Sequence, residues 1–149
     1  MKVVNTFSAK KGQSGLPRPR VELLDCIKTF GIKEDKFAGL DENTAVMVVG
    51  LKAYELARDQ GIELEQGALG ENILFDFDPH DYEFGDIIKV GEVSLELKSS
   101  CTICSHLSVF DKTLPKLVKN HRGVYCKVLS DGIIKKDMQV NILKEKKEN

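Results

Sequence analysis

The stretch Ile87-Ile-Lys-Val-Gly91-Glu-Val93-Ser-Leu-Glu-Leu97 decides the fold class of this chain. In its second half, apolar residues alternate with polar ones, which is the period-2 pattern of a strand with one buried face. Its single glycine, Gly91, stands at the turn between two apolar runs. The stretch is therefore predicted to form a β-hairpin.

Other short apolar runs predict further strands, and they lie at residues 3–7, 21–24, 45–49, 73–75, 124–129 and 138–143. Residues 51–61 have the composition of a helix, with Gly61 at the place of a C-terminal cap. A second short helix is predicted from residue 112 or 113 to about 119, with Pro115 in its first turn. Many strands without regular helix alternation predict a mainly β fold, a barrel or strongly curved sheet with a few appended helices.

The size and charge of the chain limit its classes of function. At 149 residues it has the length of one domain, so residues 1–143 are predicted to form a single domain and the charged residues 144–149 a disordered tail. The 22 basic and 23 acidic residues favour neither nucleic acid nor an anionic membrane as a partner. No apolar run approaches the roughly 20 residues that span a bilayer, and no signal peptide is evident, so a cytoplasmic protein is expected.

The four cysteines divide into two groups. In a reducing compartment they are expected to be thiols. Cys126 alternates with Val124 and Val128 on one face of a predicted strand, and Cys26 has apolar neighbours, so both are predicted to be core residues. Cys101 and Cys104 are three residues apart after a strand, so both sulfurs can reach one centre. With His106 nearby, the pair suits a soft metal such as zinc, copper or molybdenum. Either cysteine of the pair is alternatively a small buried residue.

A second candidate site lies at Gly67-Ala-Leu-Gly70-Glu71-Asn72-Ile73. Its two glycines allow backbone conformations closed to other residues, while Glu71 and Asn72 offer a carboxylate and an amide at the start of a strand. The same residues would also suit a purely structural turn.

Two basic segments are candidates for anion binding. The turn Asn120-His121-Arg122-Gly123 precedes a strand, and an arginine there can bind phosphate through a fixed fork of donors. The alternative is that this segment is a surface turn without a binding role. Residues 9–20 are rich in glycine, proline and positive charge, which predicts an ordered loop or flap able to reach an anion.

These segments, in this order, resemble the MOSC domain family, named for the C-terminal domain of molybdenum-cofactor sulfurase, and in particular its stand-alone bacterial members. The resemblance covers about residues 3–143 and is carried by residues 31–39, the Gly-x-x-Gly-Glu-Asn-Ile motif at 67–73, Gly85-Asp86, the cysteine after the next strand, and residues 121–129. It implies a MOSC-type β-barrel, similar to the β-barrel domain of pyruvate kinase, with a pocket lined by the Gly70-Glu71-Asn72 turn.

The resemblance also implies a cofactor and an activity. The family's Pro-Cys-x-x-Leu pattern maps onto residues 103–107, so Cys104 is the expected catalytic thiolate and molybdenum ligand, with Cys101 the second choice. The implied cofactor is the molybdenum cofactor (molybdopterin), and the implied activity is reduction of N-hydroxylated compounds. A separate reductase would supply electrons, because the chain has no flavin, haem or iron–sulfur motif. The expected cofactor-binding residues are Gly70, Glu71, Asn72, Cys101, His106, His121 and Arg122.

Two alternatives stay open. The paired thiols suit a non-enzymatic sulfur carrier or cofactor-delivery module, with a persulfide on Cys104 that Cys101 resolves. A zinc-stabilised binding domain would use Cys101, Cys104, His106 and His121 as ligands, with Cys126 a further candidate.

The chain departs from the family pattern at Glu34 in place of a glycine, at Ile103 in place of a proline, and at Thr44 in place of an arginine. Cationic side chains able to replace that arginine are expected from the predicted loops, at Lys10, Lys11, Arg18, Arg20 or Arg122.

Overall fold

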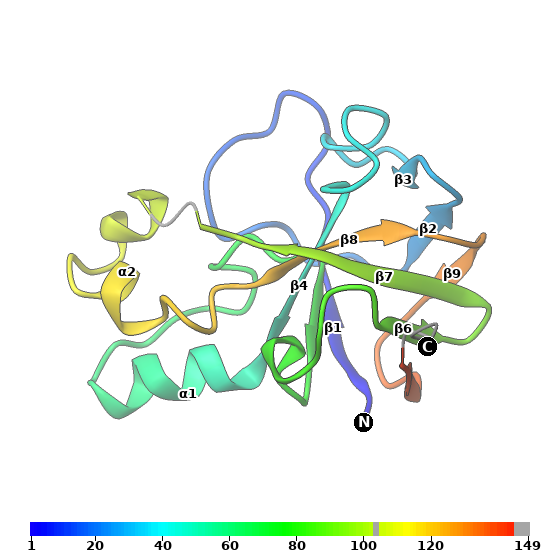
Figure 1. Ribbon diagram of the computed structural model, residues 1–149. Helices are drawn as coiled ribbons and strands as arrows, with labels where there is room; N and C mark the ends of the chain where they lie inside the picture. The colour runs from blue at the N-terminus through cyan, green and yellow to red at the C-terminus, as the bar shows by residue number, and fades with distance from the viewer. Residues whose placement is uncertain (103–104, 145–149) are drawn as a thin grey trace.

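Two β-sheets dominate the fold of this computed structural model, which describes residues 1–102 and 105–144 (Figure 1). The larger sheet has the order β1-β5-β4-β8-β7-β6-β10, and the smaller has the order β3-β2-β9. The strands of the larger sheet are β1 (Val3–Thr6), β4 (Val46–Gly50), β5 (Ile73–Phe75), β6 (Ile87–Val90), β7 (Val93–Ser100), β8 (Val124–Val128) and β10 (Val140–Leu143). Those of the smaller are β2 (Leu24–Ile27), β3 (Gly31–Ile32) and β9 (Gly132–Ile134).

The larger sheet curls until its two edges meet. Lys2, beside β1, and Gln139, beside β10, form an antiparallel bridge. The backbone N–H of Val3 donates to the carbonyl of Met138 at 3.0 Å, and that of Val140 donates to the carbonyl of Met1 at 2.9 Å. Joining the edges satisfies backbone groups that an open sheet would leave unpaired. The predicted mainly β, barrel-like fold is confirmed.

The hairpin that decided the fold class is present. β6 and β7 pair antiparallel around Gly91, with Val90 opposite Val93. β7 extends to Ser100, beyond the predicted end at residue 97, and pairs with β8 along its second half. This extension places Cys101 directly after the last paired residue of β7.

Helices cover one side of the larger sheet. They are α1 (Leu51–Asp59) and α2 (Leu114–Leu117), with short 3-10 turns η1 (Pro79–Asp81) and η2 (Ser105–Val109). Figure 1 shows α1 and α2 at one side and the small β2-β3-β9 sheet at the other. α1 connects β4 to β5, which pair in parallel, because parallel neighbours need a crossover. No helix among the described residues is long and apolar enough to cross a membrane.

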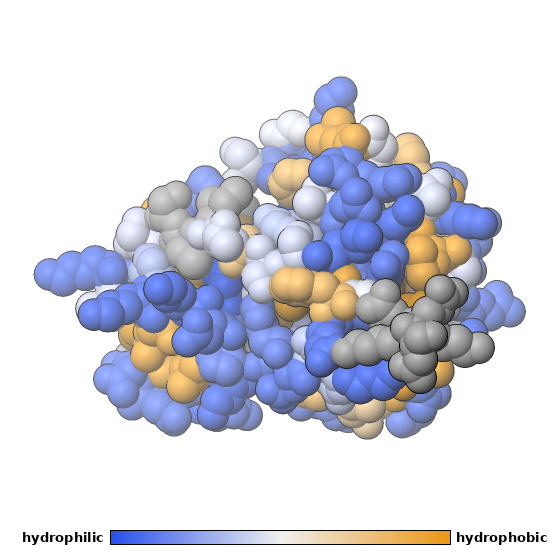
Figure 2. All heavy atoms as spheres, in the orientation of Figure 1, coloured by the Kyte–Doolittle hydropathy of each residue, from blue (hydrophilic) through white to orange (hydrophobic). Residues whose placement is uncertain are grey.

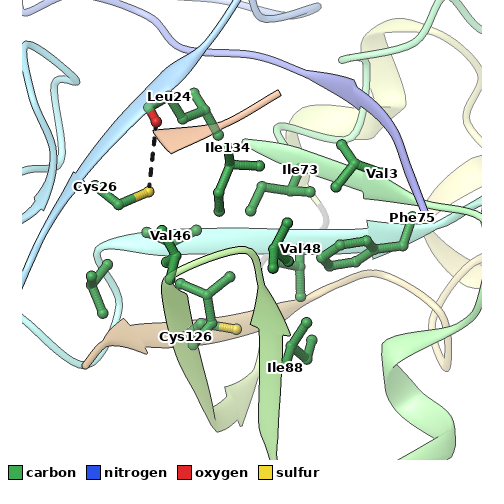
Figure 3. Packing of buried hydrophobic residues seen from close by; sticks show 14 of the residues in the cluster. Val3, Leu24, Cys26, Val46, Val48, Ile73, Phe75, Ile88, Cys126 and Ile134 are labelled. Atoms are coloured by element: carbon green, nitrogen blue, oxygen red, sulfur yellow. Dashed lines mark hydrogen bonds between the residues drawn. The ribbon is translucent and has the colours of Figure 1, made fainter. Parts of the chain in front are cut away.

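The core has two parts, and β4 is the wall between them. Val46 and Val48 point into the barrel, whereas Met47 and Val49 pack under α1 and α2. This explains why β4 is apolar at every position. Figure 3 shows Cys26 and Cys126 among the apolar side chains inside the barrel, which confirms both as core residues. On the face in Figure 2, apolar residues occur in small groups among hydrophilic ones.

Some predicted elements differ from the structure. The strand expected at 21–24 lies instead at 24–27, where Leu24 pairs with β9 and Cys26 with β3. Val21 pairs with Thr6 instead: its N–H donates to the Thr6 carbonyl at 3.0 Å, and its carbonyl accepts the Thr6 hydroxyl at 2.6 Å. β3 and β9 were not predicted, since runs of two and three residues are too short for a periodic pattern. The second helix is shorter than expected, with Pro115 in its first turn as predicted. Residues 145–149 lie outside the described residues, so the tail stays a prediction.

Candidate functional site: a cationic pocket beside a thiol

A pocket of about 440 Å³ opens between the 15–18 segment, the Gly67–Gly70 turn and the ends of β7 and β8. This volume lies within the range of small-molecule sites. The pocket brings together the basic loop, the glycine turn and the basic turn before β8, which are far apart in the sequence. Its polar lining residues are Arg18, Lys36, Cys101, His106, Arg122 and Tyr125.

Arg122 lines this pocket although its residue is only 4% exposed. One of its terminal N–H groups donates to the carbonyl oxygen of Leu69 in the glycine turn. Its Nε has no hydrogen-bond partner within the described residues. Buried guanidinium donors are costly to leave unpaired, so this side chain has binding capacity left for a ligand.

Arg18 is the second cation of the pocket. Its guanidinium lies 3.9 Å from a carboxylate oxygen of Asp35, too far for a hydrogen bond, and it lies over the ring of Phe37 at 4.9 Å from the centroid. Nη1 is buried and has no hydrogen-bond partner among the residues described. Burial lowers the pKa of Arg18, an effect that the charges of Asp35 and Glu71 oppose. An anion in the pocket would stabilise this cation further.

The acidic groups nearby do not cancel this charge. Glu71 is fully buried, and burial raises the pKa of its carboxyl, which favours the uncharged form. Asp35 accepts hydrogen bonds from Ser8 and Asn72 at 2.7 and 3.2 Å and is not among the residues that line the pocket. With Lys36 at the lining as well, the pocket is cationic.

Tyr54 of α1 fixes the glycine turn. Its hydroxyl accepts the backbone N–H of Gly67 at 3.1 Å and donates to Oε2 of Glu71 at 2.5 Å. At Gly67 φ is +93°, and a Cβ there would lie 2.7 Å from the carbonyl oxygen of Arg18. The close approach is needed because the Gly67 carbonyl accepts the N–H of Arg18 at 3.0 Å. The turn thus holds Arg18 at the pocket.

Of the predicted Gly70-Glu71-Asn72 set, only Gly70 lines the pocket. Asn72 lies behind it, where its side-chain oxygen accepts the N–H of Met47 and its amide donates to the carbonyl of Phe7 and to Asp35. Glu71 and Asn72 therefore support the pocket wall, and their expected contact with a cofactor stays a prediction.

One thiol of the described residues lines the pocket. Cys101 is 4% exposed, and Tyr125 donates its hydroxyl to Sγ at 3.4 Å. Burial, together with this contact, raises the pKa of Tyr125 to about 12, so the phenol keeps its proton. Cys104 lies outside the described residues, so its role stays a prediction. His106 is exposed and lines the same pocket, as expected.

His121 does not line this pocket, and its expected part in cofactor binding stays a prediction. It was expected beside Arg122, but its Nδ1 donates to a carboxylate oxygen of Asp78, and it is not among the pocket-lining residues. His121 and Arg122 therefore bind different partners, Asp78 and the carbonyl of Leu69. No group of three or more histidine, cysteine or acidic residues able to hold a metal occurs in the described part of the chain. The zinc alternative requires Cys104, which lies outside the described residues, so it stays a prediction.

Of the five cations expected to replace the missing arginine, Arg18 and Arg122 line the pocket. Lys36 and Tyr125 were missed, although both lie in stretches that carry the family resemblance, because neither residue was singled out there as a binding group. Tyr54 lies in the helix predicted at residues 51–61, and the helical pattern gives no sign that its hydroxyl secures the glycine turn.

The fold and the site define a class: a nearly closed β-barrel with a cationic, thiol-bearing pocket where strands and loops meet. The MOSC domain family matches over residues 34–141. This chain therefore belongs to the MOSC domain family.

Solved structures share this fold over nearly the whole chain. The YuaD protein of Bacillus subtilis is 13% identical with a TM-score of 0.81, and the alignment covers 98% of both chains. YiiM of Geobacillus stearothermophilus is 19% identical with a TM-score of 0.77, over 96% of this chain and 75% of that one. YiiM of Escherichia coli is 18% identical with a TM-score of 0.65, over 99% and 72%. A search of curated protein sequences finds no match to this chain.

Proposed function

We propose that this protein binds the molybdenum cofactor in the pocket between Arg18 and Arg122, beside a cysteine thiolate. The observation that carries the proposal is the pair of buried guanidinium groups whose Nη1 and Nε have no hydrogen-bond partner among the described residues. Molybdopterin carries a phosphate, and arginine binds phosphate oxygens through charge-assisted hydrogen bonds. The family's association with this cofactor agrees with the proposal.

The residues of the pocket fit such an anion. Arg18 and Arg122 would hold its negative charge, and Lys36 would contribute from the lining. Cys101, held by the Tyr125 hydroxyl, and Cys104, favoured by the family pattern, are the two candidate thiolate ligands. A soft metal is the natural partner of a thiolate. When bound, the cofactor would supply two-electron redox chemistry at its metal.

The activity that follows is reduction of an N-hydroxylated compound. The N–O bond breaks, and two electrons and two protons convert the substrate to the amine and water. A separate reductase would provide the electrons, as the family resemblance implies. Within the chain, the arginines bind and orient the anion, and the thiol completes the pocket.

The test is expression in a host that makes the cofactor, followed by analysis of bound molybdenum and pterin. We expect both in the wild type and less of both in Arg18→Gln and Arg122→Gln. Arg20→Gln is the matched control, since Arg20 is exposed and pairs only with Glu22 among the described residues. Cys101→Ala and Cys104→Ala identify the ligand, because only one should lose molybdenum. A wild type that contains neither molybdenum nor pterin would remove the proposal.

A sulfur carrier is the second candidate function. It is favoured by the position of Cys101, a residue that lines two pockets although only 4% of it is exposed. A carrier should show a species about 32 Da heavier, one sulfur atom, that disappears on reduction. Intact-protein mass spectrometry before and after reductant distinguishes this function from cofactor binding.

A further inference from the structure

Cys101 also lines a second pocket, of about 360 Å³, whose lining includes His80 and neither arginine. His80 lies in η1, which begins after Asp78, and the carboxylate of Asp78 accepts the His80 N–H at 2.9 Å. His80 was not singled out by its sequence, and the cofactor proposal assigns it no part.

The ring of His80 is joined to Cys101 by a chain of two hydrogen bonds. The backbone N–H of Gly123 donates to Nε2 of His80 at 3.0 Å. The carbonyl oxygen of the same Gly123 accepts the backbone N–H of Cys101 at 2.8 Å. Gly123 directly follows Arg122, so one residue links His80 to both the pocket thiol and the pocket arginine.

Packing on the other side leaves Gly123 little freedom. Its φ is +137°, and a Cβ there would lie 3.1 Å from Val49 and 3.2 Å from Met47. Gly123 is therefore held between the side chains of β4 and the His80 ring. Among the described residues, His80 provides the acceptor for this N–H.

The contact requires the neutral ring. Nε2 must carry a lone pair to accept the Gly123 N–H, so the proton of the ring resides on Nδ1. Burial lowers the pKa of His80, which agrees with this state; the charge of His121 acts in the same direction, and Asp78 and Asp81 oppose it. The rings of His80 and His121 stand edge to face with centroids 6.3 Å apart.

We propose that His80 is a positioning residue: by accepting the Gly123 N–H, it fixes Cys101 and Arg122 relative to each other at the ligand pocket. It acts through Gly123 rather than through a ligand. The inference rests on the proposed function only in its choice of Cys101 and Arg122 as the residues that bind the ligand. Its test can be made on the chain without cofactor.

The experiment compares three substitutions of His80. His80→Gln keeps an acceptor at nearly the position of Nε2, His80→Asn has the same amide on a shorter side chain, and His80→Leu has no acceptor. All three are made in a Cys104→Ser background, so that Cys101 is followed without interference from its neighbour. The readouts are the exchange rate of the Gly123 amide by NMR and the rate of iodoacetamide alkylation of Cys101 by peptide mass spectrometry.

We expect the Asn and Leu variants to exchange the Gly123 amide about tenfold faster, the effect of losing one hydrogen bond. Cys101 should be alkylated several-fold faster in both, because its N–H partner is no longer held. His80→Gln should restore both rates to near the wild-type values, which general loss of packing at this position would not allow. Melting temperatures identify any variant that fails to fold.

Wild-type rates in folded Asn and Leu variants would overturn the inference, as would a folded Gln variant that behaves like Asn. These readouts need no bound molybdenum or pterin. A wild type without cofactor therefore removes the proposed function and leaves the positioning role to be decided by the exchange and alkylation rates.

Discussion

Removing the hydroxyl of Tyr54 is the sharpest test of how the glycine turn is held. In Tyr54→Phe, Gly67 loses the acceptor of its N–H, and Glu71 loses the O–H that donates to Oε2 at 2.5 Å. Each bond contributes about 1 kcal/mol net, and a buried polar group left without its partner costs about 1–3 kcal/mol more. The other carboxyl oxygen, Oε1, has no hydrogen-bond partner among the described residues to compensate. We expect a loss of about 3 kcal/mol.

Urea unfolding followed by circular dichroism measures this loss as a shift of the midpoint at constant slope. Tyr82→Phe is the control, because its hydroxyl makes only an exposed contact with the sulfur of Met1 among the described residues. Replacing both partners by apolar groups, in Tyr54→Phe with Glu71→Leu, should cost less than the sum of the single changes. A loss below about 1 kcal/mol in Tyr54→Phe would refute the reasoning.

Three further predictions concern single residues. Burial lowers the pKa of His80, so the stability that its neutral ring contributes is present above the unfolded pKa of about 6.5 and is lost as the pH falls through the lower folded pKa. The free energy of unfolding should therefore fall between pH 8 and pH 5, and His80→Gln should make this fall smaller. Burial raises the pKa of the Cys26 thiol to about 12 and that of Cys126 as well, so Ellman's reagent should modify neither in the folded protein and both in denaturant. Exposed Glu34 has a φ of +69° where the family pattern has glycine, so Glu34→Gly should raise the unfolding free energy by about 0.5 kcal/mol, the difference between relieved backbone strain and added chain entropy, and a lower melting temperature would contradict this.

The parts that could be predicted from the sequence are those with a regular pattern. The β6-β7 hairpin follows from alternation and one glycine, and the burial of Cys126 follows from its place in an alternating strand. Strands of two or three residues carry no period, so β3 and β9 could not be found. Their partners are chosen by the tertiary fold.

The pocket could be predicted only in part, because its residues come from separate loops. Arg122 and Gly70 lie in recognisable turns, and both line it. In the sequence, Arg18 is one of several equivalent cations. The structure distinguishes it, because its backbone N–H donates to the carbonyl of Gly67 and this bond holds it at the pocket. His121 shows the reverse: its place in the sequence beside Arg122 suggested a shared role, and its pairing with Asp78 separates them.

The closure of the barrel has a consequence for how the protein folds. The bond between Val3 and Met138 joins residues that are 135 positions apart, so forming it costs a large loop-closure entropy until the intervening strands are in place. Contacts of such long range slow folding, and we expect this seam to close last. Until it does, the free edges of β1 and β10 are open to strand pairing with other chains. Slow closure would therefore make aggregation during refolding depend steeply on protein concentration.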